Sequence, residues 1–296
     1  MRATKKRELS RCQGEILLAA VIIARSTSFL CSKLVLQSMG PFTLMAVRFL
    51  LAFSLLAVVF RKRLAASDRT TLLCGFILGA SFFAVMTAEL FGLRLTDSST
   101  TSFLENTAIV FVPLLEALLL RRLPRPVALG SSLITIIGIG FLTLGNNSSF
   151  SLGRGEALCV LAAILYATSI LLTDRLSRQG DAFIIGLLQV GFMGFLSLIA
   201  AFLFESPRLP ETRLEWGAIL WLSLVCSGFG FTLQPVAQRH TTAERAGMFC
   251  ALSPVSAAIL GTCILHEELG FYGLVGAAFV MTGILISTLC GKSQSH

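Results

Sequence analysis

Six ionisable side chains stand inside long apolar stretches of this sequence, and their types allow chemistry inside a bilayer. They are Arg25, Lys33, Arg48, Glu89, Glu105 and Glu116. A charge at the centre of a bilayer-spanning helix costs about 2.5–3.5 kcal/mol on insertion scales, so such a residue persists where it faces protein or a wet cavity. These residues therefore predict a polar site that binds a charged solute or a proton.

Glu105 is the strongest single candidate for such a site. It stands in TSFLENTAIVFVP, beside Asn106 and Thr107 and ahead of Pro113. Its polar neighbours favour a patch that faces a cavity. Two interpretations stay open: a site for a substrate ammonium group or a proton, and a structural ion pair with one of the intramembrane cations.

Arg25 lies near the middle of the first apolar stretch, where its side chain cannot easily reach either membrane surface. We therefore expect it to face the central cavity, paired with Glu105 or with an anionic substrate. Glu89 and Arg48 are weaker candidates for this site. For Glu89 the favoured alternative is an interfacial carboxylate, and for Arg48 it is a structural anchor. Lys33 stands close enough to the end of its stretch to snorkel.

Neutral amides add hydrogen-bonding capacity without the cost of a charge. Gln189 and Gln234 occupy later apolar stretches and are further candidates for substrate contact. Pro113, Pro235 and Pro254 each remove a backbone hydrogen bond, which allows either a gating kink or simple curvature.

The composition indicates where such a site must reside. The chain has 296 residues, of which 55% are hydrophobic and 14% charged, with a mean hydropathy of +0.82. Soluble domains carry about 25% charged residues, so this chain lacks the polar surface that water requires. The net charge of +8 resides in short connectors rather than on one interleaved face, which argues against nucleic-acid binding.

Ten apolar stretches of membrane-crossing length divide the chain, which predicts an all-α integral membrane fold with ten transmembrane helices. The stretches are Ile16–Leu36, Pro41–Phe60, Thr71–Leu93, Ser99–Leu120, Pro126–Leu144, Gly155–Thr173, Ala182–Phe204, Trp216–Ala237, Ala246–Leu265 and Leu269–Cys290. If the amino terminus is inside, the inner connectors hold 17 Lys and Arg residues and the outer connectors hold 4. This bias predicts a multi-pass protein of the cell inner (plasma) membrane with both termini in the cytoplasm.

The chain also repeats itself. GEILLAAVIIARSTSFL, from Gly14, resembles GEALCVLAAILYATSIL, from Gly155, and this alignment puts Tyr166 at the position of Arg25. Tyr166 is therefore expected to point at the same cavity, with a packing role as the alternative. The repeats, residues 1–146 and 153–291, each contain five helices. Because five is odd, the second repeat is predicted to be inverted in the membrane, an arrangement that supports alternating access.

The ordered set of motifs resembles the EamA-like family of the drug/metabolite transporter superfamily. The resemblance is closest in LQPVAQRHTTAERAGMFCALSPVSAAILGTCILHEELGFYGLVGAAFVMTGILI, residues 233–286, and continues in FVPLLEALLL and MAVRFLLA of the first repeat. Arg25-Ser26 stand where the family usually has Trp-Gly, and Arg121-Arg122-Leu123-Pro124 replace its Gly-Glu-Arg-Leu. The resemblance implies transport of small metabolites, often amino acids or related solutes, without ATP.

We therefore expect a secondary transporter that exports a small polar or amphipathic metabolite by alternating access, with proton coupling as an option. The partners expected are a small-molecule substrate and the lipid bilayer, and the chain is expected to act as a monomer or a homodimer. No nucleotide-binding loop, nucleophile elbow or zinc motif is present, so no cofactor, metal or enzymatic activity is expected. A membrane sensor or an intramembrane enzyme without transport is the alternative.

Overall fold

The computed structural model describes residues 11–119, 121, 126–144, 153–240, 253 and 270–292. Within these residues every regular element is a helix, and seven helices are long and apolar enough to cross a membrane. The all-helical membrane fold is therefore confirmed, whereas the predicted stretch Ala246–Leu265 lies outside the described residues except for Ser253.

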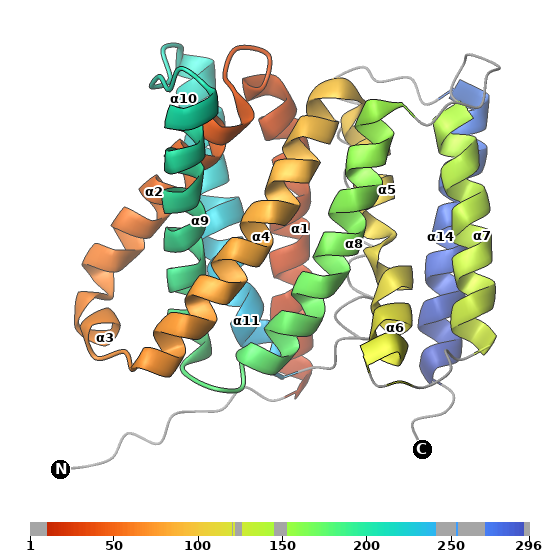
Figure 1. The fold of residues 1–296 in the computed structure, drawn as a ribbon, viewed down its shortest axis with the longest axis horizontal. Coiled ribbons are helices and arrows are strands. Elements are labelled where there is room, and N and C mark those ends of the chain that lie inside the picture. The colour runs from red at the N-terminus through yellow and green to blue at the C-terminus, as the bar shows by residue number, and fades with distance from the viewer. Residues whose placement is uncertain are drawn as a thin grey trace.

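The helices follow one another along the chain with short connections. Their bounds are α1 Arg11–Val35, α2 Pro41–Val59, α3 Arg61–Ala65, α4 Arg69–Leu95, α5 Ser98–Asn106, α6 Ala108–Leu119, α7 Pro126–Leu144, α8 Arg154–Leu176, α9 Ala182–Phe204, α10 Arg213–Trp221, the π-helix η1 Leu222–Phe231, α11 Thr232–Gln238 and α14 Gly270–Lys292. The long helices stand roughly side by side, and α1 begins on the side of the bundle where α14 ends (Figure 1).

Polar residues just before several helices fix where those helices begin. The Asp68 carboxylate accepts a hydrogen bond from the Thr71 amide at 3.2 Å, and Asp181 caps α9 in the same way. The hydrogen bonds from Thr71 also hold the pKa of Asp68 below its ordinary value. Thr212 and Glu215 form a reciprocal capping box at the start of α10. Each cap satisfies amide groups that the first turn of a helix leaves unpaired.

Two expected helices are interrupted in the structure. The predicted helix Ser99–Leu120 breaks at Thr107 into α5 and α6. There the Asn106 amide donates to the Ser102 carbonyl at 2.7 Å and the Thr107 hydroxyl to the Leu104 carbonyl at 2.6 Å. Such side-chain hydrogen bonds compete with the backbone hydrogen bonds of the helix. The spacing of apolar residues in the sequence does not reveal this competition.

The predicted helix Trp216–Ala237 is the second case, because its middle is the π-helix η1. Pro235 cannot donate to the carbonyl four residues earlier, that of Phe231, where η1 ends. A π-helix is rare and often marks a functional site, because it widens the helix and redirects its side chains.

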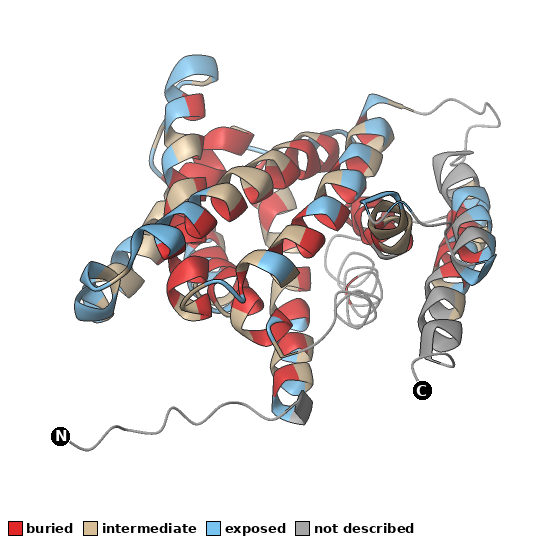
Figure 2. Cartoon of the chain, turned by 60° about the horizontal axis from the view of Figure 1, so that its bottom comes forward, coloured by how far each residue is buried: buried red, intermediate tan, exposed pale blue. Residues whose placement is uncertain are grey.

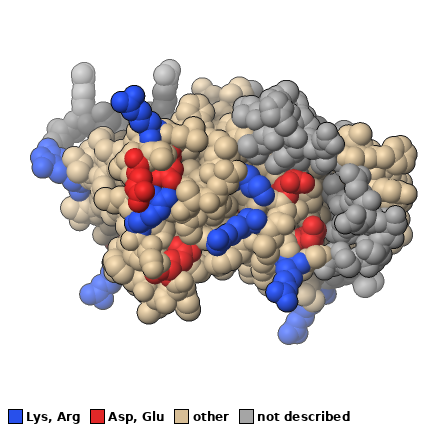
Figure 3. All heavy atoms as spheres, turned by 90° about the horizontal axis from the view of Figure 1, so that it is seen from above, with Lys and Arg blue, Asp and Glu red and all other residues tan. Residues whose placement is uncertain are grey.

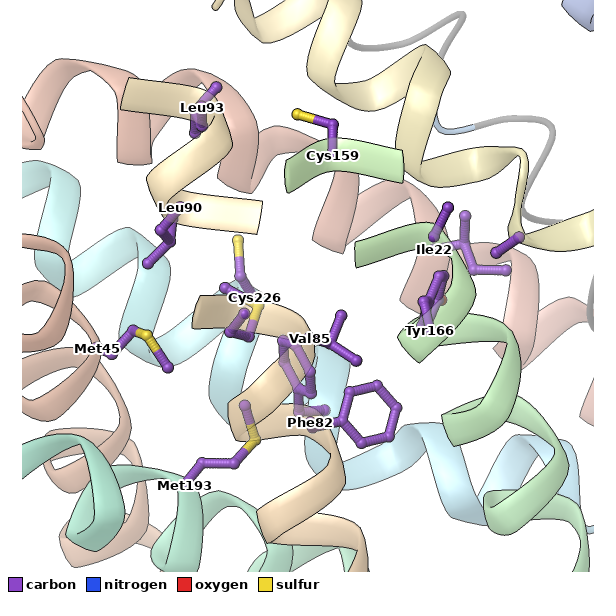
Figure 4. Packing of buried hydrophobic residues seen from close by; sticks show 14 of the residues in the cluster. Ile22, Met45, Phe82, Val85, Leu90, Leu93, Cys159, Tyr166, Met193 and Cys226 are labelled. Carbon is purple, nitrogen blue, oxygen red and sulfur yellow. The ribbon is translucent and has the colours of Figure 1, made fainter. Parts of the chain in front are cut away.

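Aromatic rings from three helices meet at the centre of the bundle. Phe231 packs edge-on against Phe49 and Phe82, with ring centroids 5.4 and 5.5 Å apart. Figure 4 shows Phe82 and Val85 of α4 in this core, together with Ile22 of α1 and Tyr166 of α8. Buried residues face the interior, and exposed residues line the outer sides of the helices (Figure 2).

The helices α7 and α14 form a closely packed pair at one end of the bundle (Figure 1). The rings of Phe141 and Phe279 stack with centroids 5.7 Å apart. Gly138 lets the backbones approach, since a Cβ there would lie 2.7 Å from the Val280 amide nitrogen. Small residues commonly permit this kind of contact between membrane helices.

Candidate substrate-binding site

A small internal cavity lies where the first and second halves of the chain meet. It has a volume of about 20 Å³, which is room for about one water molecule. It is lined by Ile22, Arg25, Ser28, Phe29, Met86, Glu89, Glu105, Asn106, Tyr166, Phe231 and Ser253. Five residues that the sequence singled out therefore line one cavity: Arg25, Glu89, Glu105, Asn106 and Tyr166. This cavity volume is too small for a metabolite in the present conformation.

Arg25 is held in this cavity by partners from the second half of the chain. One guanidinium nitrogen donates to the Tyr166 hydroxyl at 3.0 Å and to the Gln234 amide oxygen at 2.8 Å. The guanidinium carbon lies 4.1 Å from the centroid of the Phe231 ring. Both of these partners are neutral and come from the second half of the chain. The side chain faces the cavity, as its mid-helix position predicted.

Gly230 makes room for this arrangement. A Cβ at that position would lie 2.7 Å from Cγ of Arg25. The π-helical segment therefore places the Phe231 ring against Arg25, and the absence of a side chain at Gly230 leaves space for the Arg25 side chain. The π-helix η1 therefore packs directly against the Arg25 side chain.

Two carboxyl groups lie on the same cavity wall. Glu89 on α4 and Glu105 on α5 are 2% and 3% exposed. Both line the cavity beside Arg25 and interact electrostatically with its guanidinium. Glu89 is thus a buried cavity residue instead of an interfacial carboxylate. The break at Thr107 ends α5 directly after Glu105 and Asn106, which turns this polar pair toward the bundle interior.

Arg48 is completely buried but does not line the cavity. It donates to the Ser227 hydroxyl at 3.2 Å and to the Ser32 hydroxyl at 3.5 Å, while its other terminal nitrogen has no hydrogen-bond partner among the described residues. Its guanidinium packs 4.6 Å from the Phe49 centroid. These contacts tie α2 to α1 and to η1.

Gln189 and Gln234 have different surroundings. Gln234 receives the hydrogen bond from Arg25, so it belongs to the shell that supports the cavity. Gln189 is fully buried on α9, does not line the cavity, and neither polar atom of its amide finds a partner among the described residues. The structure therefore does not bring Gln189 into the candidate site.

Lys33 does not reach outward as a snorkelling residue would. Its ammonium group donates to the Leu93 carbonyl at 2.8 Å and to the Thr96 carbonyl. These carbonyls end α4, where a cation is stabilised by the unpaired acceptors and the helix dipole.

Several lining residues escaped the sequence reasoning, although helical spacing points to them. Ile22, Ser28 and Phe29 stand three or four residues from Arg25, and Met86 stands three residues before Glu89. Residues at this spacing share one helix face. Phe231 and Ser253 carry no comparable signal. Among the described residues, no group of three or more His, Cys, Asp or Glu is placed to hold a metal ion.

Long apolar helices around a small charged cavity define a multi-pass membrane protein with an internal polar site. The chain belongs to the EamA-like transporter family, whose sequence model matches residues 13–144 and 153–289. The family resemblance drawn from the sequence motifs is thereby confirmed.

Similar proteins cover nearly the whole chain. An uncharacterized transporter from Archaeoglobus fulgidus is 27% identical over 286 residues, which is 92% of this chain and 96% of the relative. The uncharacterized transporter YetK of Bacillus subtilis is 26% identical, with coverage of 93% and 86%. One solved crystal structure has a TM-score of 0.70 at 18% identity, covering 97% of this chain and all of that chain, which establishes similarity of fold.

Proposed function

We propose that this chain is a secondary transporter that carries a small metabolite across the cytoplasmic membrane by alternating access. The observation that carries the proposal is the placement of Arg25. Its guanidinium is held by Tyr166 and Gln234 and lines the same cavity as two carboxyl groups. A cavity with both signs of charge suits a small solute that also carries both.

The substrate class that best fits this wall is an amino acid or a related polar or amphipathic solute, moved by export. Arg25 suits a carboxylate because its planar donors match the two oxygens of that group. Glu89 and Glu105 suit an ammonium group, and the rings of Phe29 and Phe231 suit an apolar side chain. The Arg25 position also differs from the Trp-Gly usual in the family, so the substrate need not be one that typical members carry.

Alternating access rests on the proposed architecture of ten helices in two inverted repeats with both termini inside. Support comes from the two successive family matches in one chain and from α1 and α14, which respectively begin and end on one side. Both halves line the cavity, with Arg25 and Glu105 from the first and Tyr166 from the second. Since the cavity has room for about one water molecule, substrate entry requires it to widen, which a movement of the two halves apart would achieve.

Solute counterflow in proteoliposomes tests the proposal directly. Vesicles loaded with an unlabelled mixture of amino acids should transiently accumulate the same labelled amino acids from outside. Arg25→Ala and Glu105→Gln should abolish or strongly reduce this accumulation. Arg94→Ala is the matched control, because Arg94 is exposed at the end of α4 and does not line the cavity.

The results also separate the alternatives. Correctly folded protein that gives no counterflow with any amino acid would contradict this substrate class and return a membrane sensor or an intramembrane enzyme to consideration. Counterflow that survives Arg25→Ala unchanged would remove the cavity from the mechanism.

A further inference from the structure

A groove with a volume of about 470 Å³ lies between α4 and α8 and shares no lining residue with the central cavity. Its wall is apolar. Thr87 is the one polar side chain among the eight lining residues, and its hydroxyl donates to the Phe83 carbonyl at 2.7 Å. Leu161 in the wall is 46% exposed, so the groove opens to the outside of the bundle. In a membrane this groove faces the acyl chains of lipid.

The groove follows one face of each helix and ends at an arginine on both. Steps of three and four residues place side chains on one helix face, and the wall contains two such series: Ala84, Thr87 and Phe91 on α4, and Leu158, Leu161 and Leu165 on α8. Arg94 continues the first series three residues after Phe91. Arg154 continues the second series four residues before Leu158.

The two arginines stand at the same end of the groove, because α4 ends where α8 begins (Figure 1). The helices are close there, since a Cβ at Gly155 would lie 2.9 Å from the Cβ of Leu95. Arg94 and Arg154 are exposed, and neither has a hydrogen bond or an ion pair among the described residues. Figure 3 looks onto this end of the molecule, where basic side chains project from the surface.

Two acidic residues, Asp97 and Glu156, also stand near this end of the helices. Glu156 lies two positions after Arg154 and therefore on another side of α8, where it accepts a hydrogen bond from the Thr96 hydroxyl at 3.5 Å. Asp97 follows the end of α4 and is the N-cap residue of α5. The charges that continue the two faces of the groove are therefore both positive.

The length of the groove matches one leaflet of a bilayer. Arg94 is ten positions from Ala84, and Arg154 is eleven positions from Leu165. At about 1.5 Å per residue each series spans about 15 Å. The hydrocarbon core of a bilayer is about 30 Å thick, so half of it is also about 15 Å. A lipid whose headgroup lies at the arginines therefore has apolar wall beside its acyl chain as far as the middle of the bilayer.

We propose that the α4–α8 groove binds one anionic phospholipid, with an acyl chain along the groove and the phosphate group at Arg94 and Arg154. Guanidinium groups suit phosphate oxygens because their planar donors bind two oxygens at once. A free phosphate ion would have no use for the apolar wall, and a neutral lipid would have none for the arginines. In the orientation proposed for the chain, this lipid belongs to the outer leaflet.

Native mass spectrometry of the delipidated protein in detergent tests the headgroup. Dioleoyl phosphatidylglycerol and dioleoyl phosphatidylcholine have the same acyl chains and differ in net charge. The wild type should bind the first phosphatidylglycerol molecule at least about tenfold more tightly, because each arginine near an anionic lipid contributes about fivefold. Loss of the lipid site should leave the cavity intact, since neither arginine lines it.

The double variant Arg94→Gln/Arg154→Gln should reduce the affinity for phosphatidylglycerol to that for phosphatidylcholine. Arg213→Gln is the matched control, because Arg213 is exposed at the start of α10, at the same end of the molecule, and does not line the groove (Figure 1). It should keep the preference of the wild type. Circular dichroism checks that each variant folds.

Two further variants test the groove itself. Ala84→Phe should fill it and weaken the binding of both lipids at least about fivefold, because each acyl CH₂ group that loses its apolar contact costs about fourfold. Leu161→Gln makes the wall polar at an exposed position and should act in the same direction. Ala278→Phe on α14 is the matched control, since Ala278 is exposed and does not line the groove.

Equal affinities of the wild type for the two lipids would overturn the anionic headgroup, as would equal losses in Arg213→Gln and the double arginine variant. Lipid binding that survives both Ala84→Phe and Leu161→Gln would overturn the groove as the site. A wild-type dimer that lipid does not dissociate, and that Ala84→Phe splits, would assign the groove to a second copy of this chain. These measurements involve no transport, so the lipid site and the proposed function can fail independently.

Discussion

The carboxylate of Glu205 caps the first turn of α2, where Thr43 donates two of the three hydrogen bonds that it accepts. Glu205 follows α9 and accepts hydrogen bonds from the Thr43 amide at 2.8 Å, the Thr43 hydroxyl at 2.7 Å and the Phe42 amide at 3.0 Å. The N-cap residue of α2 is Gly40, which offers no side-chain cap of its own. A residue more than 160 positions away therefore completes this helix.

Removing that cap should destabilise the protein. We expect Glu205→Ala to lower the free energy of unfolding by about 1–2 kcal/mol, since a lost N-cap costs about 0.5–2 kcal/mol. Denaturant unfolding in detergent measures the change. Glu211→Ala is the control, because Glu211 is 75% exposed and pairs with Arg208 at 3.6 Å. Equal effects of the two substitutions would contradict the capping role.

A second contact between the halves joins α3, the short helix after α2, to the start of α9. Two nitrogens of Arg63 donate to the two carboxylate oxygens of Asp181, each at 2.9 Å, in a partly exposed ion pair. We expect Arg63→Ala to cost less than about 1 kcal/mol at low ionic strength. Screening should remove the difference at high salt, where the Debye length falls to about 3 Å. A cost that is independent of salt would show that packing on Phe183 dominates.

The α7–α14 pair offers a test of close helix packing within one helix. Gly138→Ala should lower the melting temperature, because its Cβ would press on the Val280 backbone and overpacking costs about 1–3 kcal/mol. Gly130→Ala should leave stability unchanged or raise it by up to about 1 kcal/mol, since nothing lies within 4 Å of its Cβ and alanine favours helix. If both variants behave alike, the contact at Gly138 is not tight.

Tyr166→Phe isolates the hydrogen bond to Arg25 while the ring contacts remain. The donor is the charged guanidinium of Arg25, and a hydrogen bond that involves a charged group is worth about 1.5–3 kcal/mol, so we expect amino-acid counterflow to fall at least about tenfold with little change in melting temperature. Tyr272→Phe is the matched control at an exposed position on α14. Unchanged counterflow in Tyr166→Phe would mean that its hydroxyl does not orient Arg25 for transport.

Gly230→Ala tests whether η1 positions Arg25. The added methyl group would meet Cγ of Arg25 at 2.7 Å, and the flexible side chain must then shift. We expect counterflow to fall at least about fivefold, which corresponds to about 1 kcal/mol. Gly217→Ala on α10 has open space around its Cβ and should be silent. The clearest contrary result is a Gly230→Ala variant with wild-type counterflow.

Local patterns in the sequence were sufficient for the membrane class, for the family and for most of the helices. Lipid cannot pair with backbone amides, so a long apolar stretch must become a helix wherever it folds. The same reasoning located Arg25 and Glu105 in the cavity wall, because a mid-helix charge must find protein or water. It also pointed to Tyr166 through the internal repeat.

The positions at which two helices are interrupted could not be predicted from apolar patterns. The interruption at Thr107 and the π-helix before Pro235 depend on hydrogen bonds and packing that apolar periodicity does not encode. Both interruptions lie at the cavity. They determine where Glu105 and Phe231 point, so an uninterrupted helix would have given a different site.

The sequence by itself determined which residues are too polar for lipid and must be sheltered, because that cost is a property of each side chain. Only the tertiary structure decided which of them shelter one another. Arg25 meets Tyr166 and Gln234 across 141 and 209 positions of the chain, whereas Gln189 and Arg48 are buried elsewhere. Partner choice depends on how the helices pack, and packing is settled by contacts among residues far apart in the chain.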